Sequence, residues 1–277
     1  MKSIRDTRWA WQKLNGFVYG GVIGWLMLPL ACAQSNPIQI ENTKPGTADW
    51  QLTDPASNRE IEGYASVTTV NRGGQILFFV NTAEASYQIE VFRVGWYGGL
   101  GARQMITPIM RTGTPQVIPS PDPVSGMIEC NWSDPYVLTI PNNLSDPSDW
   151  ASGVYLAKLT AATSGKQAYI VFVVRDDTRA SDILFQSAVT TYEAYNNWGG
   201  KSLYSFNSTG TQAVKVSFNR PYVDGNGAGY FLSWEIYMLR FLEREGQDVT
   251  YVSSIDMHAN SALINSHKVF LSVGHDE

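Results

Sequence analysis

The spacing of apolar residues changes partway along the chain, and this change limits the possible folds more than any other feature of the sequence. From about Ile61 to Val174 the apolar residues form short runs separated by turn residues. After the charged segment Arg175–Asp182, strand-like runs alternate with runs of helical period. The first pattern is typical of a β-sandwich, and the second of a parallel sheet covered by helices. We therefore predict two different domains with a boundary at Arg175–Asp182.

The first predicted domain covers residues 61–175. It contains about seven short strands at the spacing of an immunoglobulin-like β-sandwich. Asn71–Gly74 separates the strand-like runs 62–70 and 75–80 and has the composition of a hairpin turn. The segment 107–126 is rich in proline and glycine, so we expect a long surface loop there.

The second predicted domain covers residues 183–277 and has the alternation of a doubly wound α/β sheet. Ile183 to Val189 is expected to be a buried strand, and Val269 to Val273 a later strand that ends in Gly274-His-Asp-Glu277. Because no helix follows this last strand, we expect the α/β domain to be incomplete. Five apolar residues between the strands fall on one helical face: Phe231, Trp234, Met238, Phe241 and Leu242.

The first 33 residues have the pattern of an export signal. Four basic residues precede the apolar run Phe17 to Leu30, and Ala31-Cys32-Ala33 matches the small-residue cleavage pattern. We expect cleavage near Ala33, an exported protein, and an N-terminal segment 34–60 before the sandwich. An uncleaved anchor helix and a lipid anchor at Cys32 are the alternatives.

The charge of the mature chain excludes two classes of partner. Cleavage removes four of the 20 basic residues and one of the 25 acidic residues, which leaves a net charge of −8. Such a chain is a poor ligand for nucleic acid or for anionic lipid, so we expect no nucleic acid and no membrane contact beyond export. Cys130 then remains as the only cysteine, which excludes an internal disulfide.

The decapeptide Thr191-Tyr-Glu-Ala-Tyr-Asn-Asn-Trp-Gly-Gly200 is the strongest candidate for a site. It places two phenols, two carboxamides and an indole directly after a strand-like run. In open α/β sheets, ligands bind at the carboxyl ends of the strands. We therefore expect this stretch to line a site.

Several motifs in one order resemble the large (β) subunit family of N,N-dimethylformamidase. The resemblance runs from about Ile61 to Glu277. The matching pieces are Arg93-Val-Gly-Trp-Tyr-Gly-Gly99, Ser152-Gly-Val-Tyr155, Thr191 to Gly200 with Ser202-Leu-Tyr204, Leu242-Glu-Arg-Glu-Gly246 and Gly274-His-Asp-Glu277.

This resemblance implies a fold, an activity and a metal. The resemblance implies a β-sandwich joined to a sheet domain that is similar to class I glutamine amidotransferases. It carries a single iron, whose ligands here would be Tyr155, Tyr195 and Glu277. Phenolate and carboxylate are hard oxygen donors that suit a ferric ion (Fe³⁺). The implied reaction is hydrolysis of the C–N bond of a small linear amide, with a small partner subunit and possible homo-oligomers.

Further residues of the same motifs are candidates for catalysis or substrate contact: Asn196, His275 and Asp276, with Trp198 beside them. Each has a structural alternative. Tyr155 could be a sandwich tyrosine whose hydroxyl bonds a loop, Asn196 could bond the backbone of its own turn, and Trp198 could be core.

Two other functions stay open from the sequence. An exported sandwich rich in tryptophan and tyrosine is also typical of a module that binds glycans or peptides. Trp96 and Tyr97, in the glycine-flanked loop Arg93 to Gly99, could form its binding surface. The other alternative is an inactive truncated fragment.

Overall fold

The computed structural model describes residues 35–277, and these form one compact unit. The predicted signal peptide 1–33, with Cys32 and the cleavage point at Ala33, lies outside the described residues. Within 35–277, no helix combines the length and the apolar character needed to cross a membrane.

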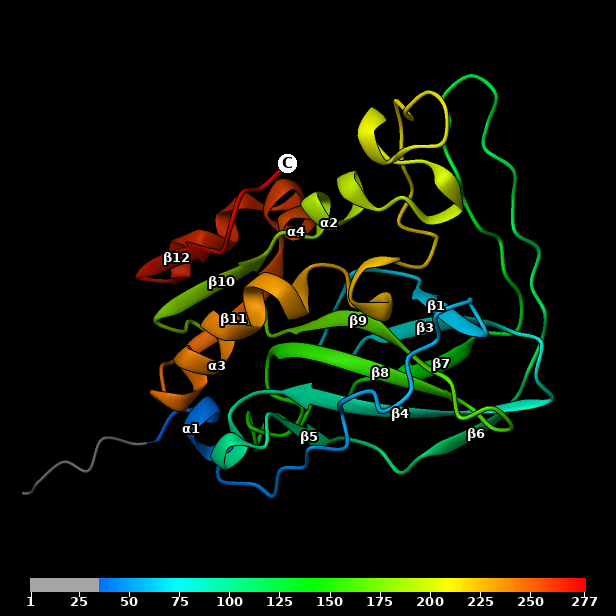
Figure 1. Cartoon of the computed structure of the whole chain (residues 1–277). Coiled ribbons are helices and arrows are strands. Elements are labelled where there is room, and N and C mark those ends of the chain that lie inside the picture. Colours follow the sequence, from blue (N-terminus) through cyan, green and yellow to red (C-terminus); the bar gives the residue numbers. More distant parts are fainter. Residues whose placement is uncertain (1–34) are drawn as a thin grey trace, which may run out of the picture. The chain divides into compact units, whose positions relative to one another are not determined.

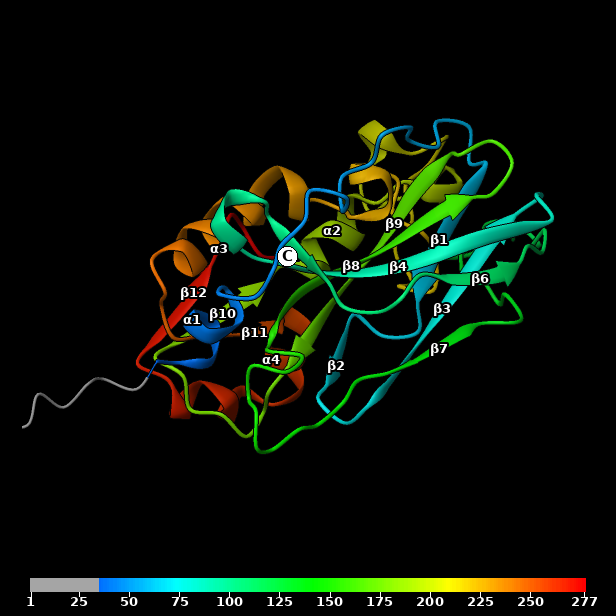
Figure 2. The same cartoon turned by 90° about the horizontal axis from the view of Figure 1, so that it is seen from below.

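Two β-sheets face one another in the first half of the described chain (Figure 1, Figure 2). One is three-stranded with the order β1-β3-β7, and the other is six-stranded with the order β2-β9-β8-β4-β5 and with β6 paired to β4. Their strands are β1 Ile61–Ala65, β2 Thr69–Asn71, β3 Gln75–Thr82, β4 Ser86–Val94, β5 Ala102–Gln104, β6 Ile109–Thr112, β7 Tyr136–Thr139, β8 Gly153–Ala161 and β9 Gln167–Arg175.

The strands of these two sheets share one apolar core. β3 buries every second residue, which are Ile76, Phe78, Val80 and Thr82, as expected for a strand with one face toward a core. β8 is buried on both faces: Tyr155 belongs to the core between the two sheets, and Leu156 to a second core on the opposite face. The six-stranded sheet is therefore the middle layer of the molecule.

The predicted hairpin around Asn71–Gly74 is wrong in one respect. The run 62–70 is not one strand, because β1 pairs antiparallel with β3 whereas β2 pairs parallel with β9 in the other sheet. The chain crosses between the sheets after Ala65. The predicted surface loop 107–126 also contains β6, which pairs antiparallel with β4.

A third sheet of three parallel strands follows, in the order β11-β10-β12. This agrees with the parallel sheet that the sequence predicts for the second half. The predicted first strand is shorter than expected, because Val189 already begins a helix. The elements are β10 Ile183–Ser187, α2 Val189–Tyr195, α3 Ile236–Arg244, β11 Val249–Ser253, α4 Ser254–Ala259 and β12 Val269–Ser272, and a short α1 Pro37–Glu41 lies near the start of the described chain.

A π-helical turn, Phe231–Glu235, directly precedes α3 and shifts its register. The sequence predicted one helical face that included both Phe231 and Phe241. In the structure Phe231 is fully buried, whereas Phe241 is 49% exposed. A π-turn holds more residues than an α-turn, so apolar positions on either side of it rotate out of phase. Gly246 follows Glu245, the C-cap of α3, with φ 64°, the left-handed conformation that glycine commonly adopts after a helix.

The middle sheet packs directly against the third sheet and α3. The core on this side includes Phe92 and Leu156 from the middle sheet, Phe185 and Tyr251 from the third sheet, and Leu239 from α3. The two predicted domains thus share a buried apolar face.

Candidate functional site

Tyr195, Tyr204 and Glu277 meet at the carboxyl ends of β10 and β12. Tyr195 is the last residue of α2, and Tyr204 lies in the loop after α2. The Tyr204 Oη donates a hydrogen bond to Glu277 Oε2 over 2.6 Å. The rings of Tyr195 and Tyr204 stack with their centroids 4.4 Å apart. Two phenols and a carboxylate from distant parts of the chain therefore form one group.

His275 completes this group, which we call the Tyr204 cluster (Tyr195, Tyr204, His275 and Glu277). The His275 Nε2 lies 3.0 Å from Glu277 Oε1, so the two carboxylate oxygens have different partners. The imidazole ring also lies edge-on to Tyr195, with centroids 5.9 Å apart. The side chains of His275 and Glu277 are 53% and 25% exposed, so the cluster is open to solvent.

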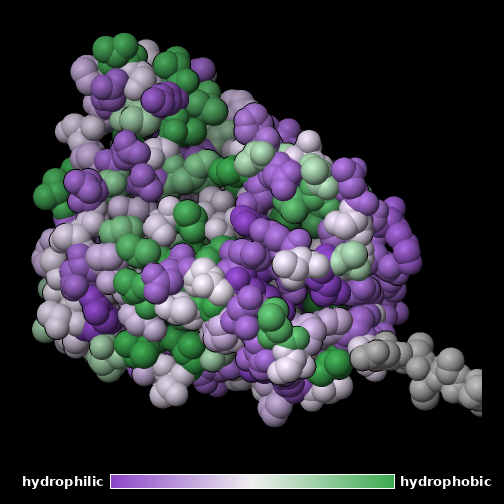
Figure 3. Space-filling model, turned by 180° about the vertical axis from the view of Figure 1, so that it is seen from behind, coloured by the Kyte–Doolittle hydropathy of each residue, from purple (hydrophilic) through white to green (hydrophobic). Residues whose placement is uncertain are grey.

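Other aromatic side chains surround the Tyr204 cluster. Tyr230 and Trp234 stack on one another at 4.5 Å, Tyr230 contacts Tyr195 edge-on, and Trp234 contacts His275. Phe206 packs against Tyr204 and is itself 74% exposed. On the face shown in Figure 3, hydrophobic residues gather at the projecting upper part of an otherwise mixed surface. Phe206 and Val214, in the loop after α2, are among the exposed hydrophobic residues.

The chemistry of the Tyr204 cluster fits a cation. The hydrogen bond to Glu277, with Tyr195 alongside, raises the pKa of the Tyr204 phenol above its ordinary value. A cation that bound both the phenol oxygen and the carboxylate would have to displace the phenol proton. Among residues 35–277, histidine, cysteine, aspartate and glutamate side chains nowhere gather in threes as a metal site. A metal here would need the phenol oxygens.

The structure does not bring Tyr155 to this cluster. Tyr155 is fully buried in the core between the two facing sheets, and its hydroxyl donates to the Ala151 carbonyl over 2.7 Å. Its ring stacks on Trp150 with an interplanar angle of 4°. Burial raises the pKa of this phenol above its ordinary value. The geometry is that of the structural alternative, a sandwich tyrosine that bonds a loop.

Asp276 and Asn196 use their polar atoms within the protein. The Asp276 carboxylate accepts hydrogen bonds from Gln186 Nε2 at 2.8 Å and from Thr190 Oγ1 at 2.9 Å. Asn196 is 1% exposed, and its side-chain nitrogen donates to Glu193 and to the Pro221 carbonyl. Its side-chain oxygen accepts from two backbone amides. These contacts favour a role in holding the segments around the site.

Trp198 links the loop after α2 to the facing sheets. Its Nε1 donates to Glu62 Oε2 over 2.8 Å, and its ring packs against Trp132. The Arg59 guanidinium lies 4.5 Å from the ring centroid. Trp198 is 2% exposed, so its main contacts are within the protein and anchor the loop.

Sequence reasoning missed a buried ion pair beneath this loop. Arg220 and Glu193 are both at most 1% exposed, and they form a salt bridge. Arg220 also donates to the carbonyls of Asn196, Trp198 and Lys201, which fixes the path of the loop. Tyr204 is the last residue of the Ser202-Leu-Tyr204 motif. A tyrosine at this place is the sequence signal for a second phenol near Tyr195.

Only part of the Arg93–Gly99 motif could form the binding surface considered from the sequence, because Arg93 and Tyr97 are buried whereas Trp96 is half-buried and Gly98 and Gly99 are exposed. Arg93 is fully buried and forms a two-point ion pair with Glu243, at 2.6 and 2.9 Å. Tyr97 is 3% exposed and donates to Glu41 over 2.7 Å. Burial alone would lower the pKa of Arg93, but the combined attraction of Glu243, Tyr97 and Glu41 outweighs it and raises that pKa. We call this group, with Tyr251 bonded to Glu243, the Arg93 cluster.

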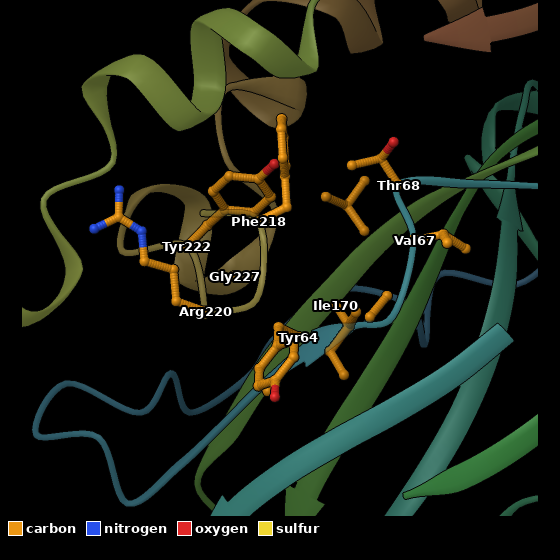
Figure 4. A pocket seen from close by; sticks show the side chains of 11 residues that line it. Tyr64, Val67, Thr68, Ile170, Phe218, Arg220, Tyr222 and Gly227 are labelled. Atoms are coloured by element: carbon orange, nitrogen blue, oxygen red, sulfur yellow. The ribbon is translucent and has the colours of Figure 1, made fainter. Parts of the chain in front are cut away.

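Two hollows lie on the other side of the loop that follows α2. One, with room for a single water-sized molecule at about 20 Å³, is lined by Tyr64, Ile170, Phe218 and Tyr222 among others (Figure 4). Beside it, a cleft of about 420 Å³ runs between Arg59, Tyr169 and the glycine-rich turn at Asn226. The first is too small for a substrate, and neither is lined by a residue of the Tyr204 cluster.

Comparison with known proteins identifies the family of this part of the chain. The model of a family described as N,N-dimethylformamidase beta subunit-like, C-terminal, matches residues 88–277. This range includes the whole Tyr204 cluster, and the Arg93 cluster apart from Glu41. No curated protein matched the chain.

Proposed function

The chain belongs to the N,N-dimethylformamidase beta subunit-like family, and on that premise we propose that it hydrolyses the C–N bond of a small linear amide at a ferric ion held by Tyr195, Tyr204 and Glu277. The observation that carries the proposal is the 2.6 Å hydrogen bond from the Tyr204 hydroxyl to the Glu277 carboxylate, together with the stacking of the Tyr195 ring on the Tyr204 ring. Tyr204 thus replaces Tyr155, the ligand that the family resemblance implies.

The donor set supports iron over other metals. Two phenolates and a carboxylate are hard, anionic oxygen ligands, which suit a ferric ion better than zinc or copper(I). When bound, such an ion would supply Lewis acidity toward an amide oxygen and would lower the pKa of water.

The side chains around the ion have separate tasks in this proposal. The His275 Nε2 fixes the Glu277 carboxylate through Oε1, which leaves Oε2 directed at the phenol of Tyr204. Tyr230 and Trp234 form an aromatic wall that would contact the apolar substituents of an amide and exclude water. The hydrogen bonds of Asn196 with the Pro221 carbonyl and of Asp276 with Gln186 would hold the segments that carry these side chains.

Further properties follow from the family and belong to the same proposal. The first half would be an immunoglobulin-like sandwich, and the second would resemble class I glutamine amidotransferases. The family description, with its beta subunit, supports a partner subunit. The basic and apolar pattern of residues 1–33 supports export.

The test is iron content together with the visible spectrum of the purified protein. We expect about one iron per chain and an absorption band from tyrosinate-to-iron charge transfer, because the ligand set is mononuclear. Tyr204→Phe and Tyr195→Phe should lose both, along with hydrolysis in a panel of small amides. Tyr155→Phe is the matched control and should keep its iron. Full iron in Tyr204→Phe, or its loss in Tyr155→Phe, would show that the ligand set is wrong.

A further inference from the structure

One buried hydroxyl bridges two residues of the C-terminal segment. Thr191, in the first turn of α2, is fully buried. Its Oγ1 donates to the His275 carbonyl over 3.0 Å and accepts the Glu277 backbone N–H over 3.0 Å. A hydroxyl has one proton to donate and lone pairs to accept, so Thr191 meets both groups at once.

The segment Gly274–Glu277 depends on such contacts because it lies beyond the sheet. β12 ends at Ser272, so no strand pairing orders the residues that follow. Thr190 and Gln186 hold the Asp276 carboxylate on one side. Thr191 is the residue that holds the backbone on either side of Asp276.

We propose that Thr191 is a positioning residue for Glu277. Its hydroxyl fixes the backbone of this segment, so that the Glu277 carboxylate lies between the Tyr204 phenol and the His275 imidazole. The consequence for iron rests on the proposed function, whereas the backbone contact does not. The two can therefore be tested separately.

The first test is hydrogen–deuterium exchange of the iron-free protein. Thr191→Val keeps the shape of the side chain but removes the hydroxyl. We expect exchange in a peptide covering 274–277 to rise about tenfold, because two hydrogen bonds to the segment are lost. Thr191→Ser keeps the hydroxyl and should exchange like the wild type. Wild-type exchange in Thr191→Val, or equal loosening in both variants, would overturn the proposal.

The second test is titration with ferric iron, followed by the charge-transfer band. We expect Thr191→Val to bind iron 10- to 100-fold more weakly, the usual range for a residue that orients a ligand, and Thr191→Ser to bind like the wild type. A wild-type protein that binds no iron, with a loosened segment in Thr191→Val, would refute the iron site and leave the positioning role standing. Iron binding by the wild type with no effect of Thr191→Val on either measurement would refute only the positioning role.

Discussion

The Arg93 cluster and the Tyr204 cluster contain similar groups in opposite surroundings. Both combine tyrosine hydroxyls with glutamate. In the Arg93 cluster, the guanidinium of a fully buried arginine neutralises Glu243, and Tyr97 bonds Glu41. In the Tyr204 cluster, the carboxylate of Glu277 contacts a phenol and an imidazole and is partly open to solvent. The difference teaches that site-like residues serve as scaffold when their charges are already matched; at the Tyr204 cluster, the cation that would match Glu277 is the ferric ion proposed above.

The largest effect is expected from breaking the Arg93 cluster. Arg93→Ala would leave Glu243 buried without its cation, so we expect a loss of about 4 kcal/mol in the free energy of unfolding. Arg111→Ala, at an exposed pair with Asp134, should cost less than about 1 kcal/mol. Urea denaturation measures both. Similar costs for the two variants would mean that burial does not distinguish the pairs.

An intermediate effect is expected beneath the Tyr204 cluster, at Glu235. Burial raises the pKa of this carboxyl from 4.5 to about 7, and one of its oxygens accepts the Ala188 N–H. Because the folded-state pKa lies above the unfolded value, the contribution to stability is complete below about pH 4.5 and is lost as the pH rises through 7. The loss should reach about 3 kcal/mol.

Glu235→Gln should remove this pH dependence, since the amide does not ionise. The measurement is the free energy of unfolding between pH 4.5 and 8, with Tyr192, Ser187 and Asp276 unchanged around the site. An equal slope in the wild type and the variant would place the titration elsewhere.

The smallest effects compare the two phenols directly, in iron-free protein. Tyr155→Phe removes a buried hydrogen bond to the Ala151 carbonyl and should lower stability by about 1 kcal/mol. Tyr204→Phe removes a partly exposed hydroxyl and should change stability by less than about 0.5 kcal/mol. Thermal unfolding of both variants gives the order. The reverse order would show that Tyr204, not Tyr155, is the structural phenol.

The sequence predicted individual strands well, because a strand leaves a local pattern of apolar residues. The apolar run of β10 reflects side-chain burial along a single strand, whereas the apolar run of β12 forms a strand although most of its side chains are exposed. The crossing between β1 and β2 was not predictable, because both sheets accept the same apolar residues. The π-turn before α3 was also missed, since no residue type marks it.

The candidate site was only partly predicted for the same reason, since local patterns do not show which distant residues meet. The motifs made Tyr195 and Glu277 candidates, but the phenol that contacts Glu277 lies 73 residues away, and its position is set by the path of a loop. That path depends on Arg220, whose bonds to three loop carbonyls exist only in the folded chain. A motif names candidate donors, whereas tertiary contacts decide which of them meet.

The middle position of the six-stranded sheet has a consequence for how the protein unfolds. Strand β8 supplies Tyr155 to one core and Leu156 to the other, so neither core can open without exposing the other. The two halves should therefore melt in a single cooperative transition, and cutting the chain at Arg175–Asp182 should yield two insoluble pieces in place of two independent domains.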